Sequence, residues 1–373
     1  QDIAATGEVV FVNSILNLLK QLKKCTKLKK IVFSGGVFQN VSLNNAIHES
    51  DIFDHVYFPM ASADSGLSLG AAFVIESKYK KRKRKTLLTP LLGPSFSDIE
   101  IKKLLDQTRI KYVKDDKIEK TVAKLINDGN TVGWFQGRGE YGPRSLGNRS
   151  ILADPRKFES KSRINQLLKK RDWFMPYAPS ILEEYIDEFV IYPDASPYMQ
   201  IAFRIKDSKK DSIPAAVHVD GTSRVHTVSR TVNLKYWNLI NEFRLLTGLP
   251  IVLNTSFNRH HIPTISEPRQ ALEHLLDGCM DYLAISNYLI SFDDNRIAKE
   301  PFKNEETENH SLKRDCIKRL ITLLETGNDN KNIIEYVKNL SKLLNTDLSF
   351  DGQIFKLGGK SVKQSEIEKT LLQ

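Results

Sequence analysis

The chain has 373 residues, a formal net charge of +10 and a hydrophobic fraction of 40%. This length favours two or three domains, and the composition excludes a disordered acidic chain or a collagen-like rod. The three cysteines form no CxxC pair, which excludes a disulfide scaffold and favours a reducing compartment. The longest apolar stretches, such as 69–75, fall short of the roughly 18 residues of a membrane helix. With no charged-then-apolar leader, the sequence predicts a cytoplasmic protein without a membrane segment.

The first 80 residues alternate between helical and extended patterns. Apolar residues at helical spacing, short β-branched runs and glycines predict helices at 9–22, 40–49 and 66–77 and strands at 30–34 and 55–59. Such alternation is typical of an α/β layer architecture. A run of basic residues covers 78–85. We interpret the stretch 81–97, which begins within this run, as a solvated linker.

The alternation resumes after the linker and continues to about residue 300. It predicts helices at 98–106, 118–127, 160–170, 234–246 and 267–276, and strands at 131–135, 199–205, 215–219, 224–228, 250–253 and 282–285. Gly248 and Pro250 form a helix stop signal. The Lys-, Asn- and Glu-rich stretch 301–373 predicts a mostly helical extension of unknown role, with helices at 312–324 and 333–344. Its run 357–361 lacks P-loop spacing and indicates a turn.

Two short motifs in the first 80 residues are candidate ligand sites. Gly35 and Gly36 end a strand just before Asn40 and the following helix, an arrangement that can present backbone N–H groups to phosphate. A plain Gly-Gly turn is the alternative. Asp64 precedes a helix, where a carboxylate either caps the helix or ligates a metal.

The loop 136–150 gives the strongest signal in the chain. It combines four glycines with Arg138, Arg144 and Arg149 directly after a strand. A guanidinium binds phosphate or carboxylate through two parallel hydrogen bonds, and glycines let the backbone approach a ligand closely. We therefore interpret this loop as a binding site for an anionic substrate.

Two further polar clusters follow. The run 218–224 is typical of a hairpin turn at Asp220-Gly221, and it ends in Arg224. Ser256 and Asn258 follow a buried strand, at the end where α/β folds bind ligands. No nucleophile triad and no HxxxH or CxxC metal pair occurs in the sequence.

The order of these motifs resembles one family closely, the O-carbamoyltransferases of the nodulation and antibiotic-tailoring type. The resemblance covers about residues 1–295 and is carried by GGVFQN, ADSGLSLGAAF, GEYGPRSLGNRSILADPR, MPYAPSIL, HVDGTSRVHTV and LNTSFN. It implies that residues 1–80 are the C-terminal piece of a Kae1-like domain of the actin/hexokinase type. It also implies that residues 98–300 form a YrdC-like α/β domain with a twisted sheet.

The same resemblance implies a reaction and its site residues. In this family the YrdC-like part makes carbamoyl-adenylate from carbamoyl phosphate and ATP, assisted by Mg²⁺. The Kae1-like part, with a divalent metal of the iron type, transfers the carbamoyl group to a hydroxyl of a small molecule or glycan. The catalytic assignments that follow are Arg144, Lys169, Arg224 and Ser256; the nucleotide-binding assignments are Gly35, Gly36, Asn40, Arg138 and Asn258, and the metal ligand is Asp64.

Three departures from the family pattern qualify these assignments. Met175 stands before Pro176 where the family commonly has an arginine, so one cationic contact is absent or supplied by Lys170 or Arg171. Arg259-His260-His261 replaces a smaller Gly-containing segment. The family's histidine metal ligands belong to an N-terminal half that the sequence does not contain, so we expect the transferase site to need that half in cis or in trans.

The leading hypothesis is that the sequence is the C-terminal portion of an ATP-dependent O-carbamoyltransferase. This portion would carry the domain that forms carbamoyl-adenylate. Two alternatives stay open. The positive charge fits a YrdC-like nucleic-acid-binding module, although nucleic acid is not our expected partner. Met175 and the tail would also fit a catalytically silent subunit of a split enzyme.

Overall fold

The computed structural model describes residues 2–80, 89–157, 177–259 and 262–295, together with 334, 337, 348–350, 355–357 and 360–362. The chain divides into two compact units, 1–301 and 302–373. In the second unit the described strands form a three-stranded antiparallel sheet of β13 Leu348–Phe350, β14 Phe355–Leu357 and β15 Lys360–Val362. Residues 358 and 359 of the run 357–361, where the turn is predicted, lie outside the described residues. The helices predicted at 312–324 and 333–344 lie outside the described residues, apart from two isolated positions.

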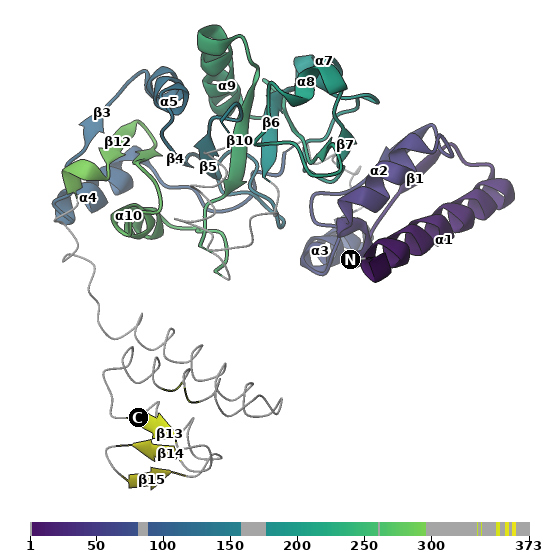
Figure 1. Ribbon diagram of the computed structural model, residues 1–373, viewed down its shortest axis with the longest axis horizontal. Coiled ribbons are helices and arrows are strands. Elements are labelled where there is room, and N and C mark those ends of the chain that lie inside the picture. The colour runs from purple at the N-terminus through teal and green to yellow at the C-terminus, as the bar shows by residue number, and fades with distance from the viewer. Residues whose placement is uncertain are drawn as a thin grey trace. The chain divides into compact units, whose positions relative to one another are not determined.

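The first 80 residues form a layer of helices around a small parallel sheet (Figure 1). Its elements are α1 Asp2–Thr26, β1 Lys30–Val32, η1 Gly36–Gln39, α2 Val41–Glu49, β2 His55–Tyr57 and α3 Ser65–Lys80. β1 and β2 pair in parallel. Phe33 and Phe58, which follow the two strands, stack with ring centroids 5.1 Å apart and form the centre of this layer.

Helix α1 buries very little of its apolar surface. Leu19 is its only buried residue. The Glu8 carboxylate accepts a hydrogen bond from Asn40 Nδ2 at 2.9 Å, and the Lys23 ammonium lies 5.2 Å from the Phe53 ring centroid. Among the described helices, α1 alone has the length and apolar composition to cross a membrane, although no uninterrupted apolar run in the sequence is that long.

The described residues from 89 to 295 form a mixed sheet of eight strands in the order β3-β12-β11-β4-β5-β10-β6-β9. Its strands are β3 Val113–Lys114, β4 Val132–Phe135, β5 Arg149–Ala153, β6 Ala178–Leu182, β9 His226–Val228, β10 Ile251–Ser256, β11 Tyr282–Ile285 and β12 Tyr288–Ser291. β4–β11 and β6–β9 pair in parallel, and the other neighbours pair antiparallel. The central strands β4, β5 and β6 are buried throughout, as expected of a sheet covered on both faces.

Helices cover the two faces of this sheet (Figure 1). α5 Ile118–Asn127 packs against α9 Leu234–Thr247 on one face, and α4 Asp98–Gln107 contacts α10 Pro268–Leu276 on the other. α5 buries Ile118, Val122, Ala123 and Ile126 at helical spacing. α9 ends at Gly248 in the left-handed conformation, which confirms the predicted stop signal.

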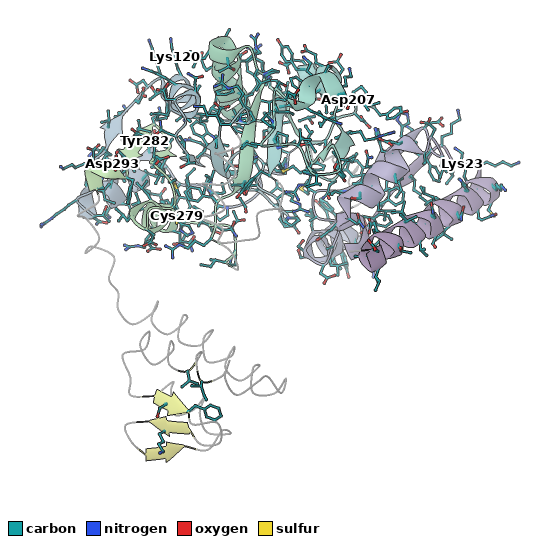
Figure 2. The ribbon with its side chains drawn as sticks, in the orientation of Figure 1. Lys23, Lys120, Asp207, Cys279, Tyr282 and Asp293 are labelled. Atoms are coloured by element: carbon teal, nitrogen blue, oxygen red, sulfur yellow. The ribbon has the colours of Figure 1, made fainter. Side chains whose placement is uncertain are left out.

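Short elements connect the sheet to the first layer. They are η3 Glu183–Tyr185, α7 Ile186–Phe189, β7 Phe203–Arg204, α8 Asp207–Lys210 and β8 Thr222–Ser223, with β7 and β8 paired antiparallel. At the other end of the sheet, η4 Asp293–Asn295 follows β12, and Asn295 bonds the Lys111 backbone. Cys25 is exposed, whereas Cys279 is buried close to α10 (Figure 2).

Two strand predictions were wrong or too long, and two strands were missed. Residues 215–219 form turns rather than a strand, because the Ala216 N–H bonds back to Ile213 and its carbonyl accepts from the Ser223 hydroxyl. Of the predicted strand 199–205, Phe203–Arg204 form β7 and Ile205 makes a single bridge to Val190. β5 and β6 were missed, because their polar and proline-containing sequences, RSILA and APSIL, lack the alternation of a half-buried strand.

The first layer and the eight-stranded sheet share a continuous interface within the first unit. Met60 and Ala61 pack with Leu146, Ala178, Tyr198 and Met199 in one buried apolar cluster. Asn44, which is fully buried on α2, donates to the carbonyls of Phe38 and Gln200 at 2.8 and 2.7 Å. Arg204 binds Glu49 with both nitrogens of its fork. The two parts are therefore joined by apolar packing and by buried polar contacts.

We predict that Asn44→Ala lowers the free energy of unfolding by about 1–3 kcal/mol, because two buried carbonyls lose their donor. Urea unfolding followed by fluorescence would measure this. Asn45→Ala, on the same helix but bonded only to Glu49 one turn later, is the control and should change stability far less. Equal losses for the two variants would contradict the prediction.

Candidate functional site

Strand register brings the described candidate residues to one edge of the sheet. Phe135 pairs with Arg149, Ser150 with Ser256, and Asn254 with Ala178. The carboxyl ends of β4 and β10 therefore lie beside the amino ends of β5 and β6, and β9 joins them in parallel with β6. We call this the loop edge. Arg144 lies in the loop between β4 and β5, Arg224 lies just before β9, and Ser256 ends β10.

Arg144 lies in an unusual environment for a guanidinium. Its side chain is largely buried, and burial lowers its pKa. Its Nε atom is buried and has no hydrogen-bond partner among the described residues. A buried cationic donor without a partner is costly unless an anion is bound. The observation therefore fits an anionic ligand at this position.

Glu140 organises the loop around Arg144, although the sequence analysis did not single it out. Its Oε1 accepts hydrogen bonds from the backbone N–H groups of Leu146, Asn148 and Arg149 at 2.7, 2.8 and 3.0 Å. A carboxylate that gathers three backbone donors fixes the path of the chain between them. The loop conformation is thus set from inside the loop itself.

Glycine conformations complete the loop. Gly142 and Gly147 have φ angles of +107° and +95°, in the left-handed region that glycine tolerates. A Cβ on Gly147 would lie 2.1 Å from the Tyr236 ring, and one on Gly142 would lie 2.5 Å from the Met60 carbonyl oxygen. Neither position can accept a larger residue without displacement of the loop.

The other two arginines of the loop have internal partners. The Arg149 side chain is buried, stacks on Phe135 and donates to the carbonyls of Gln136, Asn148, Pro94 and Gly137. Burial lowers its pKa to about 10. Arg138 donates to the carbonyls of Gly93 and Leu92 at 3.0 and 2.9 Å. These two guanidinium groups hold the segment 92–94 against the loop.

The remaining assignments for this part of the chain differ in how far the structure describes them. Arg224 is half-buried between Ser223 and Val225, both of which are buried. The Ser256 hydroxyl donates to Asn258 Oδ1, and Asn258 Nδ2 donates to the Ile262 carbonyl. Lys169, Lys170, Arg171, Met175, His260 and His261 lie outside the described residues.

The phosphate motif of the first layer has structural partners. Gly35 adopts φ +118°, and its N–H donates to the Ser62 carbonyl at 2.6 Å. Gly36 starts η1 and is exposed. Asn40 caps α2 by accepting from the N–H groups of Ser42 and Leu43, both at 3.0 Å, and it also binds Glu8. The Asn40 side chain is therefore occupied in shaping the layer.

Asp64 is exposed directly before α3. In the part of the chain that the structure describes, no group of three or more His, Cys, Asp or Glu side chains could hold a metal ion. A single exposed carboxylate does not form a binding site for a divalent metal. The described residues therefore do not fit the implied iron-type metal by themselves.

The Asp64 motif and the arginine loop nevertheless touch. The Tyr141 hydroxyl donates to the Ser65 carbonyl at the start of α3 and lies 3.2 Å from the Ser68 hydroxyl. Gly142 lies against the Met60 carbonyl. The start of α3 and the loop that carries Arg144 are thus in direct contact.

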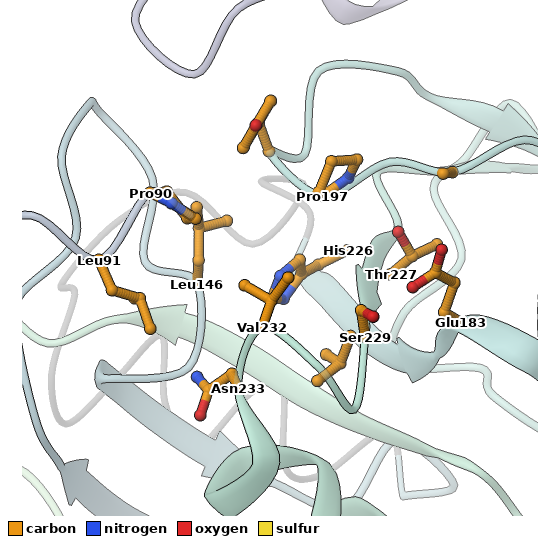
Figure 3. A pocket seen from close by; sticks show the side chains of 13 residues that line it. Pro90, Leu91, Leu146, Glu183, Pro197, His226, Thr227, Ser229, Val232 and Asn233 are labelled. Atoms are coloured by element: carbon orange, nitrogen blue, oxygen red, sulfur yellow. The ribbon is translucent and has the colours of Figure 1, made fainter. Parts of the chain in front are cut away.

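A cavity of about 200 Å³ lies along the edge strand β9 (Figure 3). Its lining residues are Pro90, Leu91, Leu146, Glu183, Ala195, Pro197, Tyr198, His226, Thr227, Val228, Ser229, Val232 and Asn233. His226 is buried, its Nδ1 lies 2.9 Å from the Ser180 hydroxyl, and its ring stacks on Tyr236. Burial lowers the pKa of His226 to about 3, so the imidazole is neutral near pH 7.

Comparison with known proteins identifies related sequences over both parts of the chain. The family model described as Carbamoyltransferase C-terminus matches residues 123–291, and the model described as Carbamoyltransferase N-terminus matches residues 1–73. The nodulation protein NolNO of Sinorhizobium fredii is 37% identical over 78% of this chain and 44% of its own length. The nodulation protein NolO of Bradyrhizobium diazoefficiens is 36% identical over 78% and 54%. The chain spans about half the length of the curated relatives it matches.

One solved structure has limited similarity. Full-length HypF, crystallised in a phosphate- and nucleotide-bound form, aligns with a TM-score of 0.32 at 21% identity, over 48% of this chain and 22% of that one.

We predict that Glu140→Ala lowers the free energy of unfolding by roughly 3 kcal/mol, because three backbone donors lose a charged acceptor. Chemical denaturation would measure the loss. Glu119→Ala, a partly exposed carboxylate on α5, is the control and should cost little. A Glu140→Ala variant as stable as this control would show that the loop does not depend on the carboxylate.

His226 predicts a specific loss of stability in acid. The unfolded chain protonates this residue near its ordinary pKa of 6.5, whereas the folded protein resists protonation down to about pH 3. Its contribution therefore falls by about 1.4 kcal/mol for each pH unit below 6.5. Thermal unfolding between pH 7 and pH 5 should fall less steeply for His226→Gln than for the unmodified protein. His55→Gln, at an exposed position, should keep the original slope, and a His226→Gln slope equal to it would contradict the prediction.

Proposed function

Because the chain belongs to the carbamoyltransferase family, we propose that its residues 98–300 form a YrdC-like domain that makes carbamoyl-adenylate from carbamoyl phosphate and ATP. The observation that carries this proposal is the environment of the Arg144 side chain. Its buried Nε without a partner among the described residues lies in a loop that Glu140 holds at the edge of the sheet. Such a donor is placed to bind a phosphoryl oxygen.

The proposed chemistry has two steps. Water first hydrolyses carbamoyl phosphate, which gives carbamate and inorganic phosphate. A carbamate oxygen then bonds to the α-phosphorus of ATP while the bond to the β-phosphate oxygen breaks, which releases pyrophosphate. Both steps move negative charge between phosphoryl oxygens, and positioned cations lower the barrier for such transfers.

Each assigned residue has a role in this proposal. Arg144, Arg224 and Lys169 neutralise the phosphoryl groups, while Ser256 and Asn258 orient the carbamoyl group by hydrogen bonds. Arg138 acts through the segment 92–93 that it holds. Bound Mg²⁺ would shield the ATP phosphates.

We propose that residues 1–80 are the final piece of a Kae1-like domain that passes the carbamoyl group to a hydroxyl of a small molecule or glycan. Gly35 and Gly36 would approach its nucleotide, and Asn40 shapes that turn. Asp64 would be one metal ligand, with the others supplied by the preceding half of the domain. We propose that the assembled enzyme acts in the cytoplasm.

Arg144→Ala should reduce pyrophosphate release from ATP and carbamoyl phosphate at least about 100-fold, since one charged contact in a transition state contributes several kcal/mol. A coupled pyrophosphate assay would measure it, with Arg109→Ala, at an exposed position after α4, as the control. Absence of release from the folded unmodified protein, or full activity of Arg144→Ala, would overturn the proposal. Binding of RNA with a steep salt dependence and no effect of ATP would instead favour a nucleic-acid-binding module.

The exposed apolar side chains of the first layer support the proposal that the preceding half of the Kae1-like domain packs against it. Large hydrophobic side chains are exposed on α1, β1 and α3, namely Ile3, Val9, Val10, Leu18, Leu22, Val32, Leu67, Phe73, Val74 and Ile75. So many exposed large hydrophobic side chains in one small layer are more typical of an interface than of a free surface. The matched part of the chain covers 44% and 54% of the two relatives, which makes the preceding half of the Kae1-like domain the proposed occupant.

We predict that a separately produced N-terminal half binds this chain, and that Val10→Asp or Val74→Asp weakens binding at least about tenfold by placing a charge in an apolar interface. Isothermal titration calorimetry would measure the affinity. Ile99→Asp, at an exposed position of α4, is the control. Failure of the halves to associate, or flotation of the chain with lipid vesicles through α1, would contradict this interface.

A further inference from the structure

The cavity along β9 differs chemically from the loop edge beside it. The loop edge carries arginines, whereas none of the described residues that line the cavity is a lysine or an arginine. Its walls are largely apolar, formed by Pro90, Leu91, Leu146, Pro197 and Val232. The cavity therefore suits an uncharged group that has flat apolar faces.

Five polar side chains also line this space, namely Glu183, His226, Thr227, Ser229 and Asn233, and the first two matter most for a ligand. The Ser180 hydroxyl accepts a hydrogen bond from Asn254 Nδ2 at 2.9 Å, so its own hydrogen is available for His226 Nδ1. The imidazole then carries its hydrogen on Nε2. Glu183 is half-buried, and its carboxylate has no hydrogen bond or ion pair with the described residues. The cavity thus offers a neutral imidazole and a carboxylate acceptor.

The two polar groups lie at different distances from the arginines. Leu146 lies two residues after Arg144 in the sequence, and His226 lies two residues after Arg224. Glu183 lies beyond the opposite end of β6, since that strand starts at the loop edge with Ala178. Figure 3 likewise shows Leu146 and Glu183 on opposite sides of the cavity, with His226 between them.

We propose that this cavity binds the adenosine part of the nucleotide, with the phosphates on the arginines of the loop edge. The ribose lies beside His226, the adenine ring packs against the apolar walls, and the exocyclic amino group of adenine donates to Glu183. A carboxylate at this end accepts from an amino group and repels phosphate, which fixes the direction of the nucleotide. The inference rests on the proposed function for the presence of a nucleotide, but the cavity can be tested separately.

Binding of free adenosine and inosine to the full chain, measured by isothermal titration calorimetry, tests the assignment. Adenosine should bind at least about tenfold more tightly than inosine, which has a carbonyl in place of the amino group and would face the Glu183 carboxylate. Glu183→Gln should reduce this preference to less than about threefold, because the amide can donate to the inosine carbonyl. Glu242→Gln, on α9 and outside the cavity, should keep the preference.

A second variant tests the cavity without relying on Glu183. Val232→Trp, at a position 37% exposed, should fill the space and weaken adenosine binding at least about tenfold. In the pyrophosphate assay it should raise KM for ATP while KM for carbamoyl phosphate stays within about twofold. Leu245→Trp, exposed on α9, should change neither quantity.

The outcomes separate the two proposals. If adenosine does not bind, or if Val232→Trp leaves both adenosine binding and KM for ATP unchanged, the cavity is not the adenosine site, whatever the activity. This includes the case in which the variant impairs only transfer to a hydroxyl acceptor. If adenosine binds and the variants behave as predicted but no pyrophosphate is released, the adenosine site stands and the proposed reaction fails.

Discussion

The Glu140 carboxylate and the three backbone N–H groups that it binds are the interaction on which the arginine loop depends. Four glycines give this loop many accessible conformations, and ordering them costs entropy. The carboxylate offsets this cost locally, while Gly142 and Gly147 permit the turns and Arg149 binds the loop to the end of β4. Arg144 is then presented by a backbone that is already fixed.

Much of this fold followed from sequence patterns, but two central strands did not. The helices α5, α9 and α10 bury residues at the spacing that predicted them. β5 begins with Arg149 and Ser150, which look solvent-exposed in sequence. Both are buried, with the Arg149 guanidinium donating to the carbonyl of the distant Pro94 and the Ser150 hydroxyl accepting from the Gly147 N–H. Partners of this kind depend on tertiary contacts and cannot be derived from local periodicity.

The candidate site, like the fold, could be predicted from the sequence only in part. The predicted strand ends led to Arg144, in a loop after a strand, and to Ser256, at the end where α/β folds bind ligands. Arg224 was assigned from the family resemblance, and only the pairing of β9 with β6 brings it to the same edge. Glu140 and His226 were missed because their importance comes from their partners. The short run HTV predicts only a strand, and nothing in it reveals that Ser180 and Tyr236 enclose the imidazole.

One buried apolar cluster is shared by the first layer and the eight-stranded sheet. Met60 and Ala61 belong to the first layer, whereas Leu146, Ala178, Tyr198 and Met199 belong to the larger sheet. A polypeptide beginning at residue 89 would leave the latter four side chains facing water. We therefore expect the two segments to unfold together, and genetic recombination that exchanged one of them would have to exchange a matching apolar surface on the other.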